Sequence, residues 1–174
     1  MERLRGDTKR LRFGPPVAYV YAPLEYAWPV ARTYLDRWGR GPKEVLFLGM
    51  NPGPFGMGQT GVPFGEIAAV RDWLRLDGEV SSPRYVHPKR RIEGFACTRS
   101  EVSGKRLWGA FAAHHRSADA FFERGFVLNY CPLLFVGETG ANVTPDKLTK
   151  EERARLEQPC DQALADAIAV LRPH

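Results

Sequence analysis

The sequence predicts an α/β fold, in which parallel strands carry helices on their faces. Two short apolar runs of strand-forming residues support this prediction, at residues 45–48 and 126–128. The segment between the runs is long and contains helical patterns, which is the kind of connection that parallel strands need. The runs lead into Asn51 and Asn129. We therefore expect two parallel strands that bring an asparagine each to the same edge of a sheet.

The first run leads into a glycine-rich loop that we expect to hold a ligand. Residues 45–48 have no polar member, so they predict a fully buried strand. Five glycines and three prolines between Gly49 and Pro63 cannot continue a strand or a helix, and they allow the backbone to approach a ligand closely. Ligands of open α/β sheets bind beyond the carboxyl ends of the strands, where this loop would lie.

The amino-terminal part of the chain predicts few regular elements. Residues 1–16 are charged and end in two prolines, so we expect an irregular arm. Residues 17–21 suit a short strand or extended segment. Apolar residues then repeat at helical spacing over residues 29–38, and the glycine at position 39 ends the pattern.

Between the two strands the pattern is mainly helical. Residues 67–74 place their apolar side chains on one helical face. Residues 76–100 are polar and broken by prolines, which predicts a solvated loop, although the basic stretch H-P-K-R-R at 87–91 could instead contact phosphates. A helix is expected to begin at Ser103, and a shorter one at residues 118–123 after Ser117.

Beyond the second strand we expect a loop and a long final helix. Pro132 and residues 137–143 predict the loop, and Thr144 followed by proline predicts a helical turn. The final helix should begin after Thr149, with Glu152 as its capping-box partner, and should be kinked or split at Pro159.

Composition limits the class of protein. At 174 residues we expect one domain over residues 1–174, and the net charge of +5 with a pI near 9.3 is compatible with a polyanionic partner such as nucleic acid. Three widely spaced cysteines predict no disulfide framework, and no metal site or other cofactor is expected. There is no apolar run of membrane-spanning length, and the first ten residues are too charged for a signal peptide. We expect an intracellular monomer, cytoplasmic in a bacterium or nuclear in a eukaryote.

Four stretches of the chain resemble a known family. They are G-M-N-P-G-P-F-G-M-G-Q-T-G-V-P-F-G-E from Gly49, E-V-S-G-K-R-L-W from Glu101, N-Y-C-P-L-L-F from Asn129 and N-V-T-P-D-K-L from Asn142. In this order they resemble the single-strand-selective monofunctional uracil-DNA glycosylases, a branch of the uracil-DNA glycosylase superfamily. The resemblance covers most of the chain. It implies a three-layer fold with a central parallel sheet flanked by helices.

The resemblance also implies roles for residues of the glycine loop and the second strand. Asn51 matches the residue that positions the attacking water, and Asn129 matches the residue whose carboxamide binds the uracil edge. Phe64 matches the ring on which the extruded base stacks, while Met50 and Gly53 line the pocket. Without a side chain at Gly53, we expect space beside C5 of the base. The plainer alternatives are a turn residue for Asn51, a strand cap for Asn129 and a core ring for Phe64.

Two further groups are candidates for contacts with DNA. Ser103 and Gly104 begin a helix, where backbone N–H groups favour phosphate, although ordinary helix capping is as good an explanation. Asn142, Thr144 and Lys147 match a DNA-facing segment of the family, with a plain loop and helix cap as the alternative. Such contacts would hold phosphates without recognising sequence.

The carboxyl end departs from the family pattern. A helix with an apolar stripe normally packs under a further strand, and two strands make a poor sheet, so the last strands are expected to be missing. The family continues with two more strands and an H-P-S-P motif that supplies a histidine to the uracil and a wedge to the DNA stack. That motif is absent here, and His174 does not match it.

The predicted function is removal of uracil and 5-substituted uracils, such as 5-hydroxymethyluracil, from single- and double-stranded DNA. Hydrolysis of the N-glycosidic bond would leave an abasic site, with base flipping to expose the target. One alternative is an impaired fragment or DNA-binding module without the histidine and wedge. Another is a nucleotide-binding enzyme that uses the glycine loop for phosphates, but the loop lacks both a P-loop lysine and a dinucleotide fingerprint.

Overall fold

A parallel strand pair lies at the centre of the molecule. The computed structural model describes residues 1–173. Strand β2 (Val45–Gly49) pairs in parallel with β3 (Gly125–Asn129), with Gly49 opposite Asn129. The pairing extends into the following loops, where the Cys131 amide donates to the Met50 carbonyl over 2.8 Å. The predicted parallel strands and their shared carboxyl edge are confirmed.

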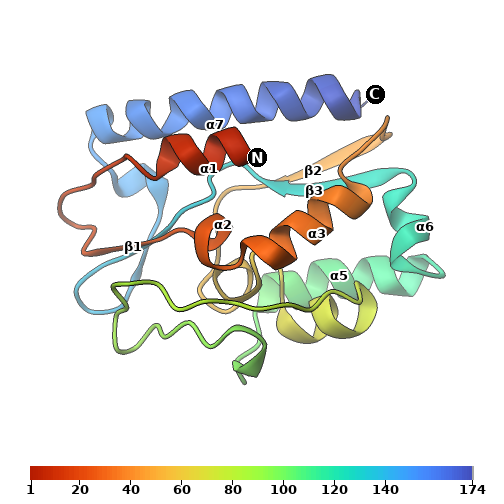
Figure 1. The fold of residues 1–174 in the computed structure, drawn as a ribbon, viewed down its shortest axis with the longest axis horizontal. Helices are drawn as coiled ribbons and strands as arrows, with labels where there is room; N and C mark the ends of the chain where they lie inside the picture. The colour runs from red at the N-terminus through yellow and green to blue at the C-terminus, as the bar shows by residue number, and fades with distance from the viewer. Residues whose placement is uncertain (174) are drawn as a thin grey trace.

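Helices lie on both sides of this pair, as the α/β prediction requires. In Figure 1 the strands run between α7 (Lys150–Leu171) with α1 (Glu2–Thr8) on one side and α5 (Val102–His114) on the other. Helix α3 (Trp28–Trp38) lies in front of the strands, and α6 (Ala118–Phe122) leads into β3.

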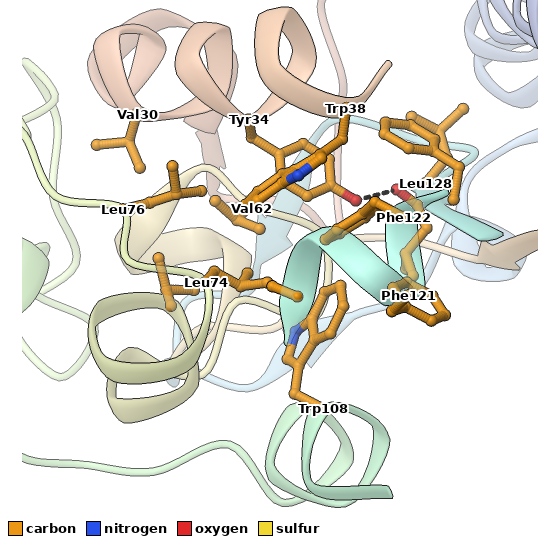
Figure 2. Packing of buried hydrophobic residues seen from close by; sticks show 14 of the residues in the cluster. Val30, Tyr34, Trp38, Val62, Leu74, Leu76, Trp108, Phe121, Phe122 and Leu128 are labelled. Atoms are coloured by element: carbon orange, nitrogen blue, oxygen red, sulfur yellow. Dashed lines mark hydrogen bonds between the residues drawn. The ribbon is translucent and has the colours of Figure 1, made fainter. Parts of the chain in front are cut away.

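The largest core cluster is aromatic and centres on α3, α6 and β3. The rings of Trp38 and Phe122 stack with centroids 4.2 Å apart and planes at 13°. Tyr34 belongs to the same group of side chains, and its hydroxyl donates to the Val127 carbonyl over 2.7 Å, the dashed line in Figure 2. A buried tyrosine needs such a partner, and this one fixes α3 to β3.

A second, antiparallel sheet was only partly predicted. Strand β1 (Tyr19–Tyr21) confirms the expected short strand, and it pairs with β4 (Leu134–Val136), which pairs with β5 (Asn142–Val143). Part of the hairpin from β4 to β5 was expected to be a loop. Strands of three and two residues are too short to show a periodic pattern, and their pairing with β1 is a long-range contact.

Three expectations about single segments are wrong. Strand β2 is not fully buried, because Val45 and Leu48 are 46% and 47% exposed. The irregular arm is helix α1, whose Leu4 is buried in one cluster with Leu156 of α7, so packing outweighs the charged composition. The glycine loop, expected to be irregular, contains a helical turn, α4 (Met57–Thr60). Another short helical turn, α2 (Pro23–Tyr26), precedes α3.

The other helical predictions agree with the structure, apart from details. Helix α3 spans the predicted residues, Ser117 caps α6, and Thr149 with Glu152 forms the predicted capping box of α7. Helix α7 continues through Pro159 instead of splitting, because Leu156 and Cys160 on either side are both buried against the same cluster.

Shorter helical segments complete the fold. The helix predicted at residues 67–74 contains a π-helical turn, η1 (Ala69–Trp73), and the loop at 76–100 holds one 3-10 turn, η2 (Gly94–Ala96). The turn after Thr144 is η3 (Pro145–Lys147). Within residues 1–173 no helix is both long enough and apolar enough to cross a bilayer.

Candidate active site

Asn129 and Phe64 meet over Gly49, at the carboxyl end of the parallel pair. A side chain on Gly49 would collide with the Asn129 Oδ1 atom, and its Cβ would lie 2.6 and 2.8 Å from two carbons of the Phe64 ring. The glycine is needed because two side chains from other segments occupy the space above it. Two of the predicted site residues are thus brought together.

The backbone of Phe64 is held in an unusual conformation. Its φ is 52°, in the left-handed region that residues other than glycine rarely adopt. The Phe64 carbonyl accepts two hydrogen bonds, from the Trp108 Nε1 over 3.0 Å and from the Glu66 amide over 2.7 Å. Such strain persists where the surroundings impose it, often at functional sites. The ring also packs against the main core cluster, so it contributes to the core as well.

The Asn129 side chain is buried and turned toward the α4 turn. It is 7% exposed, and its Nδ2 donates to the Met57 Sδ over 3.1 Å. Asn129, Met57, Gly61 and Pro63 are among the residues that line a cavity of about 20 Å³. That volume holds about one water molecule, so the cavity in this conformation is too small for a base.

Asn51 and Met50 follow β2 at the same edge but do not line this cavity. Asn51 is half-buried, and its Nδ2 donates to the neighbouring Pro52 carbonyl over 3.2 Å. Met50 is 70% exposed. The pairing of the strands therefore brings the two asparagine backbones to one edge, while in this conformation their side chains have separate partners.

The space predicted beside Gly53 is filled by a carboxyl group. A side chain on Gly53 would collide with Glu101 Oε1, and one on Gly56 would collide with Glu101 Oε2. On the helix side, a Cβ on Gly104 would lie 3.0 Å from the same Oε2. Three glycines from two segments thus make room for one carboxyl group, and this packing explains the glycine at position 53.

Glu101 is a largely buried carboxyl group with a raised pKa. It precedes α5, and its Oε2 is buried without a hydrogen-bond partner. Burial, together with the nearby negative charge of Glu66, raises the pKa of Glu101 from 4.5 to about 7. The carboxyl group is therefore close to half-protonated at neutral pH, directly against the loop that carries Asn51.

The candidate DNA contacts fall into two places. Gly104 is buried against Phe64, because a side chain there would collide with the Phe64 carbonyl, whereas Ser103 is exposed inside the first turn of α5 and makes no capping bond. Capping by Ser103, the plainer alternative, is therefore wrong.

The second group lies on the antiparallel sheet. Asn142, Thr144 and Lys147 are exposed on β5 and η3. The Thr144 hydroxyl bonds to Asp146, and the Lys147 ammonium pairs with the same carboxylate at 3.2 Å. Their role in DNA binding stays a prediction.

Several residues of the site had no role assigned from the sequence. Met57 contacts Asn129, Trp108 holds Phe64, and Glu101 supports the loop. Within the E-V-S-G stretch, roles were predicted for Ser103 and Gly104 but not for Glu101. The signal in the sequence was the set of glycines that surround the Glu101 carboxyl group, since Gly53, Gly56 and Gly104 all lie in the stretches that resemble the family. No group of three or more histidine, cysteine, aspartate or glutamate side chains within residues 1–173 is placed to hold a metal ion.

The fold and the edge of the parallel pair define the class. The chain is similar in structure to the crystal structure of wild-type Pedobacter heparinus SMUG2, with a TM-score of 0.65 and 18% sequence identity, covering 98% of this chain and 70% of that one. This likeness shows an α/β fold of the uracil-DNA glycosylase type. No protein-family model matches the sequence.

Sequence comparison gives the particular family. The chain is 50% identical over 169 residues to the single-strand selective monofunctional uracil-DNA glycosylase of Rattus norvegicus, and equally to the proteins of the same name from Mus musculus and Bos taurus. The alignments cover 97% of this chain. The chain belongs to the family of single-strand selective monofunctional uracil-DNA glycosylases. It spans 61% to 62% of the length of these relatives, which are longer.

Proposed function

We propose that this protein is a uracil-DNA glycosylase that hydrolyses the N-glycosidic bond of uracil in DNA and leaves an abasic site. The observation that carries the proposal is the 50% identity over 97% of the chain to glycosylases with this activity in their name. The position of Asn129 and Phe64 over Gly49 supports it, since these two residues match the base-binding amide and the stacking ring.

Asn129 would recognise the base through its carboxamide. The amide N–H donates to uracil O4 and the amide oxygen accepts from N3–H, whereas cytosine presents the opposite pattern. The Nδ2 atom already has a partner in the Met57 sulfur, a weak acceptor. A uracil oxygen would replace that sulfur with a stronger acceptor. Stacking on Phe64 would add roughly 1–3 kcal/mol.

Asn51 would orient the attacking water. An amide is not a base at neutral pH, so its contribution would be the position of the nucleophile, while charge on the leaving uracil is stabilised by hydrogen bonds. Asn51 would then exchange its bond to the Pro52 carbonyl for the water. The protein is proposed to act as an intracellular monomer on single- and double-stranded DNA.

The test is uracil release from a single-stranded oligonucleotide. Asn129→Asp keeps the size of the side chain but replaces the donor by a negative charge, and we expect the rate to fall by about 100- to 1000-fold. Gln162→Ala, an exposed change on α7, is the matched control and should leave the rate unchanged. An Asn129→Asp variant as active as the control would show that this amide does not recognise the base.

Removal of 5-substituted uracils is part of the proposal on the family resemblance alone. Because the Glu101 carboxyl group lies where a Gly53 side chain would go, Gly53→Tyr should disrupt the loop and reduce excision of every substrate. The direct measurement is the rate on 5-hydroxymethyluracil relative to uracil for the unaltered chain. If the chain excises uracil but not 5-hydroxymethyluracil, the proposed activity on 5-substituted uracils is wrong.

The second candidate is DNA binding without catalysis. It is favoured by the cavity beside Asn129, which at about 20 Å³ is too small for a base. The same assay separates the two, since a binding module would retain a uracil oligonucleotide and release no base. Comparison with a chain extended at its carboxyl end would show whether further residues restore excision.

A further inference from the structure

A cluster of two arginines on one aromatic ring lies beside the glycine loop. Phe55 belongs to this loop, and the Cζ atoms of Arg99 and Arg90 lie 3.8 and 5.4 Å from its ring centroid. Both distances are within the range of cation–π attraction. The ring thus orders two guanidinium groups from a distant part of the sequence, four residues from the proposed water-positioning Asn51.

Neither guanidinium is neutralised by the protein. Ten ion pairs join side chains of residues 1–173, and none of them includes Arg90 or Arg99. The Nε of Arg90 is buried, and its Nη1 makes one long contact of 3.5 Å with the Lys89 carbonyl, so the outer part of this guanidinium keeps donors for a ligand. Two ordered cations with unused donors and no carboxylate in reach make a site for an anion.

The segment that carries these arginines is fixed to the loop by Gln59. This side chain is 1% exposed and uses both ends of its amide. Its Nε2 donates to the Pro54 carbonyl over 2.8 Å and to the Arg91 carbonyl over 3.0 Å, while its Oε1 accepts from the amides of Glu93 and Gly94. The loop and the basic segment are therefore held as one unit.

A second anchor acts on the other side of the segment. The Tyr21 hydroxyl of β1 donates to the Arg90 carbonyl over 2.9 Å and accepts from the His87 amide over 2.7 Å. The backbone that presents Arg90 is therefore bound to two different elements. A preorganised cation loses less entropy when it binds a ligand than a mobile one does.

We propose that Arg90 and Arg99, ordered on Phe55, bind phosphates of the DNA strand that passes the glycine loop. The inference rests on the proposed function for the identity of the polyanion. Planar guanidinium groups present several N–H donors in a fork that matches a phosphate, and stacking on a ring leaves the edges of the fork free. Such contacts position a strand without recognising its sequence.

The experiment measures how the affinity for a single-stranded oligonucleotide without uracil depends on salt concentration. Each lost phosphate contact to single-stranded DNA should reduce the slope of log K against log salt concentration by about 0.7. We expect this reduction for Arg90→Gln and for Arg99→Gln, and about twice as much for the double variant. Arg40→Gln is the matched control, since Arg40 follows α3 with its side chain 79% exposed and should leave the slope unchanged.

Phe55→Leu tests the role of the ring. It keeps both charges and removes the stack, so we expect binding to weaken about two- to fivefold, with the slope nearly unchanged. Arg99 is exposed, so Arg99→Gln should fold normally. Its salt slope therefore tests the phosphate site even if Arg90→Gln unfolds.

The outcomes separate this proposal from the glycosylase assignment. If Arg99→Gln has the slope of Arg40→Gln, the phosphate site is wrong whether or not the chain excises uracil. If the slope falls but the unaltered chain releases no uracil, the phosphate site is supported and the catalytic proposal fails. If the same phosphate contact also holds the uracil oligonucleotide, its loss in Arg99→Gln should raise KM and leave kcat unchanged.

Discussion

Strands β2 and β3 are hydrogen-bonded partners of equal length, yet one is buried and the other is not. All five residues of β3 are buried, whereas Val45 and Leu48 of β2 are close to half exposed. The sequences of the two strands are similarly apolar. The difference therefore comes from what packs against them: residues 126–128 of β3 are buried members of the main core cluster, whereas Leu46 and Phe47 of β2 are only partly buried against it.

The segments that follow the two strands differ in the same way. Asn129, at the end of β3, is buried and its amide is bonded inside the protein. After β2, Met50 is 70% exposed and Asn51 is bonded only to the next residue. The base-recognition half of the proposed site is thus fixed in the core, and the water-positioning half depends on the loop and on Glu101.

The largest expected effect tests the comparison directly. Leu128→Ala removes a side chain that is 5% exposed, and we expect the free energy of unfolding in urea to fall by about 2–5 kcal/mol. Leu48→Ala, at 47% exposure, should cost less than about 1 kcal/mol. Equal losses for the two leucines would mean that β2 is as enclosed as β3.

The second prediction concerns the carboxyl group behind the loop of β2. Because the pKa of Glu101 is raised in the folded protein, from 4.5 to about 7, the folded state binds the proton more tightly than the unfolded state. Stability should therefore be highest below pH 4.5 as far as this group is concerned, and should fall as the pH rises toward 7, by about 3 kcal/mol in total.

Glu101→Gln should remove this dependence, because the amide is neutral throughout. At pH 8 the variant should be more stable than the parent by up to about 3 kcal/mol, measured by urea denaturation across the pH range. Glu138→Gln, on the exposed turn between β4 and β5, is the control. Parallel pH profiles for Glu101→Gln and the parent would exclude a strained, buried charge at this position.

The third prediction concerns helix α7, which covers the strand pair. Thr149→Ala removes the capping box and should lower the free energy of unfolding by about 1 kcal/mol. Ser117→Ala, which removes the cap of α6, serves as the comparison in the helix that leads into β3. Because α6 leads into the enclosed strand, we expect the free energy of unfolding to fall more in the Ser117 variant than in the Thr149 variant, measured by thermal unfolding.

The smallest effect should come from the exposed side of β2. Val45→Lys places a charge where the side chain is already 46% exposed, so stability should change by less than about 0.5 kcal/mol. Binding of an apolar fluorescent dye should decrease, because an exposed apolar patch is lost. Val20→Lys, on the antiparallel sheet at 40% exposure, is the matched control. A large loss of stability in the Val45 variant would show that β2 is packed on both sides.

Local patterns were enough to predict the elements that carry their own signals. The apolar runs predicted both parallel strands, and Thr149 with Glu152 predicted the start of α7 from a spacing of three residues. The resemblance pointed to Asn129 and Phe64, which the structure brings together over Gly49.

Features that depend on contacts between distant segments were not predicted. The exposure of Val45, the helix at residues 2–8 and the short strands β4 and β5 are set by what packs against them. The contact of Glu101 with Gly53 has the same origin. A glycine in a sequence shows that a side chain is absent, but only the fold shows that Glu101 fills the space.

The left-handed backbone of Phe64 has a consequence for evolution as well as for binding. The Trp108 indole and the Glu66 amide both donate to the Phe64 carbonyl. Loss of either hydrogen bond would favour relaxation of the Phe64 backbone from its left-handed conformation. The position of the Phe64 ring is therefore fixed before any ligand binds. Phe64 and Trp108, 44 residues apart in the sequence, are therefore expected to change together or remain unchanged.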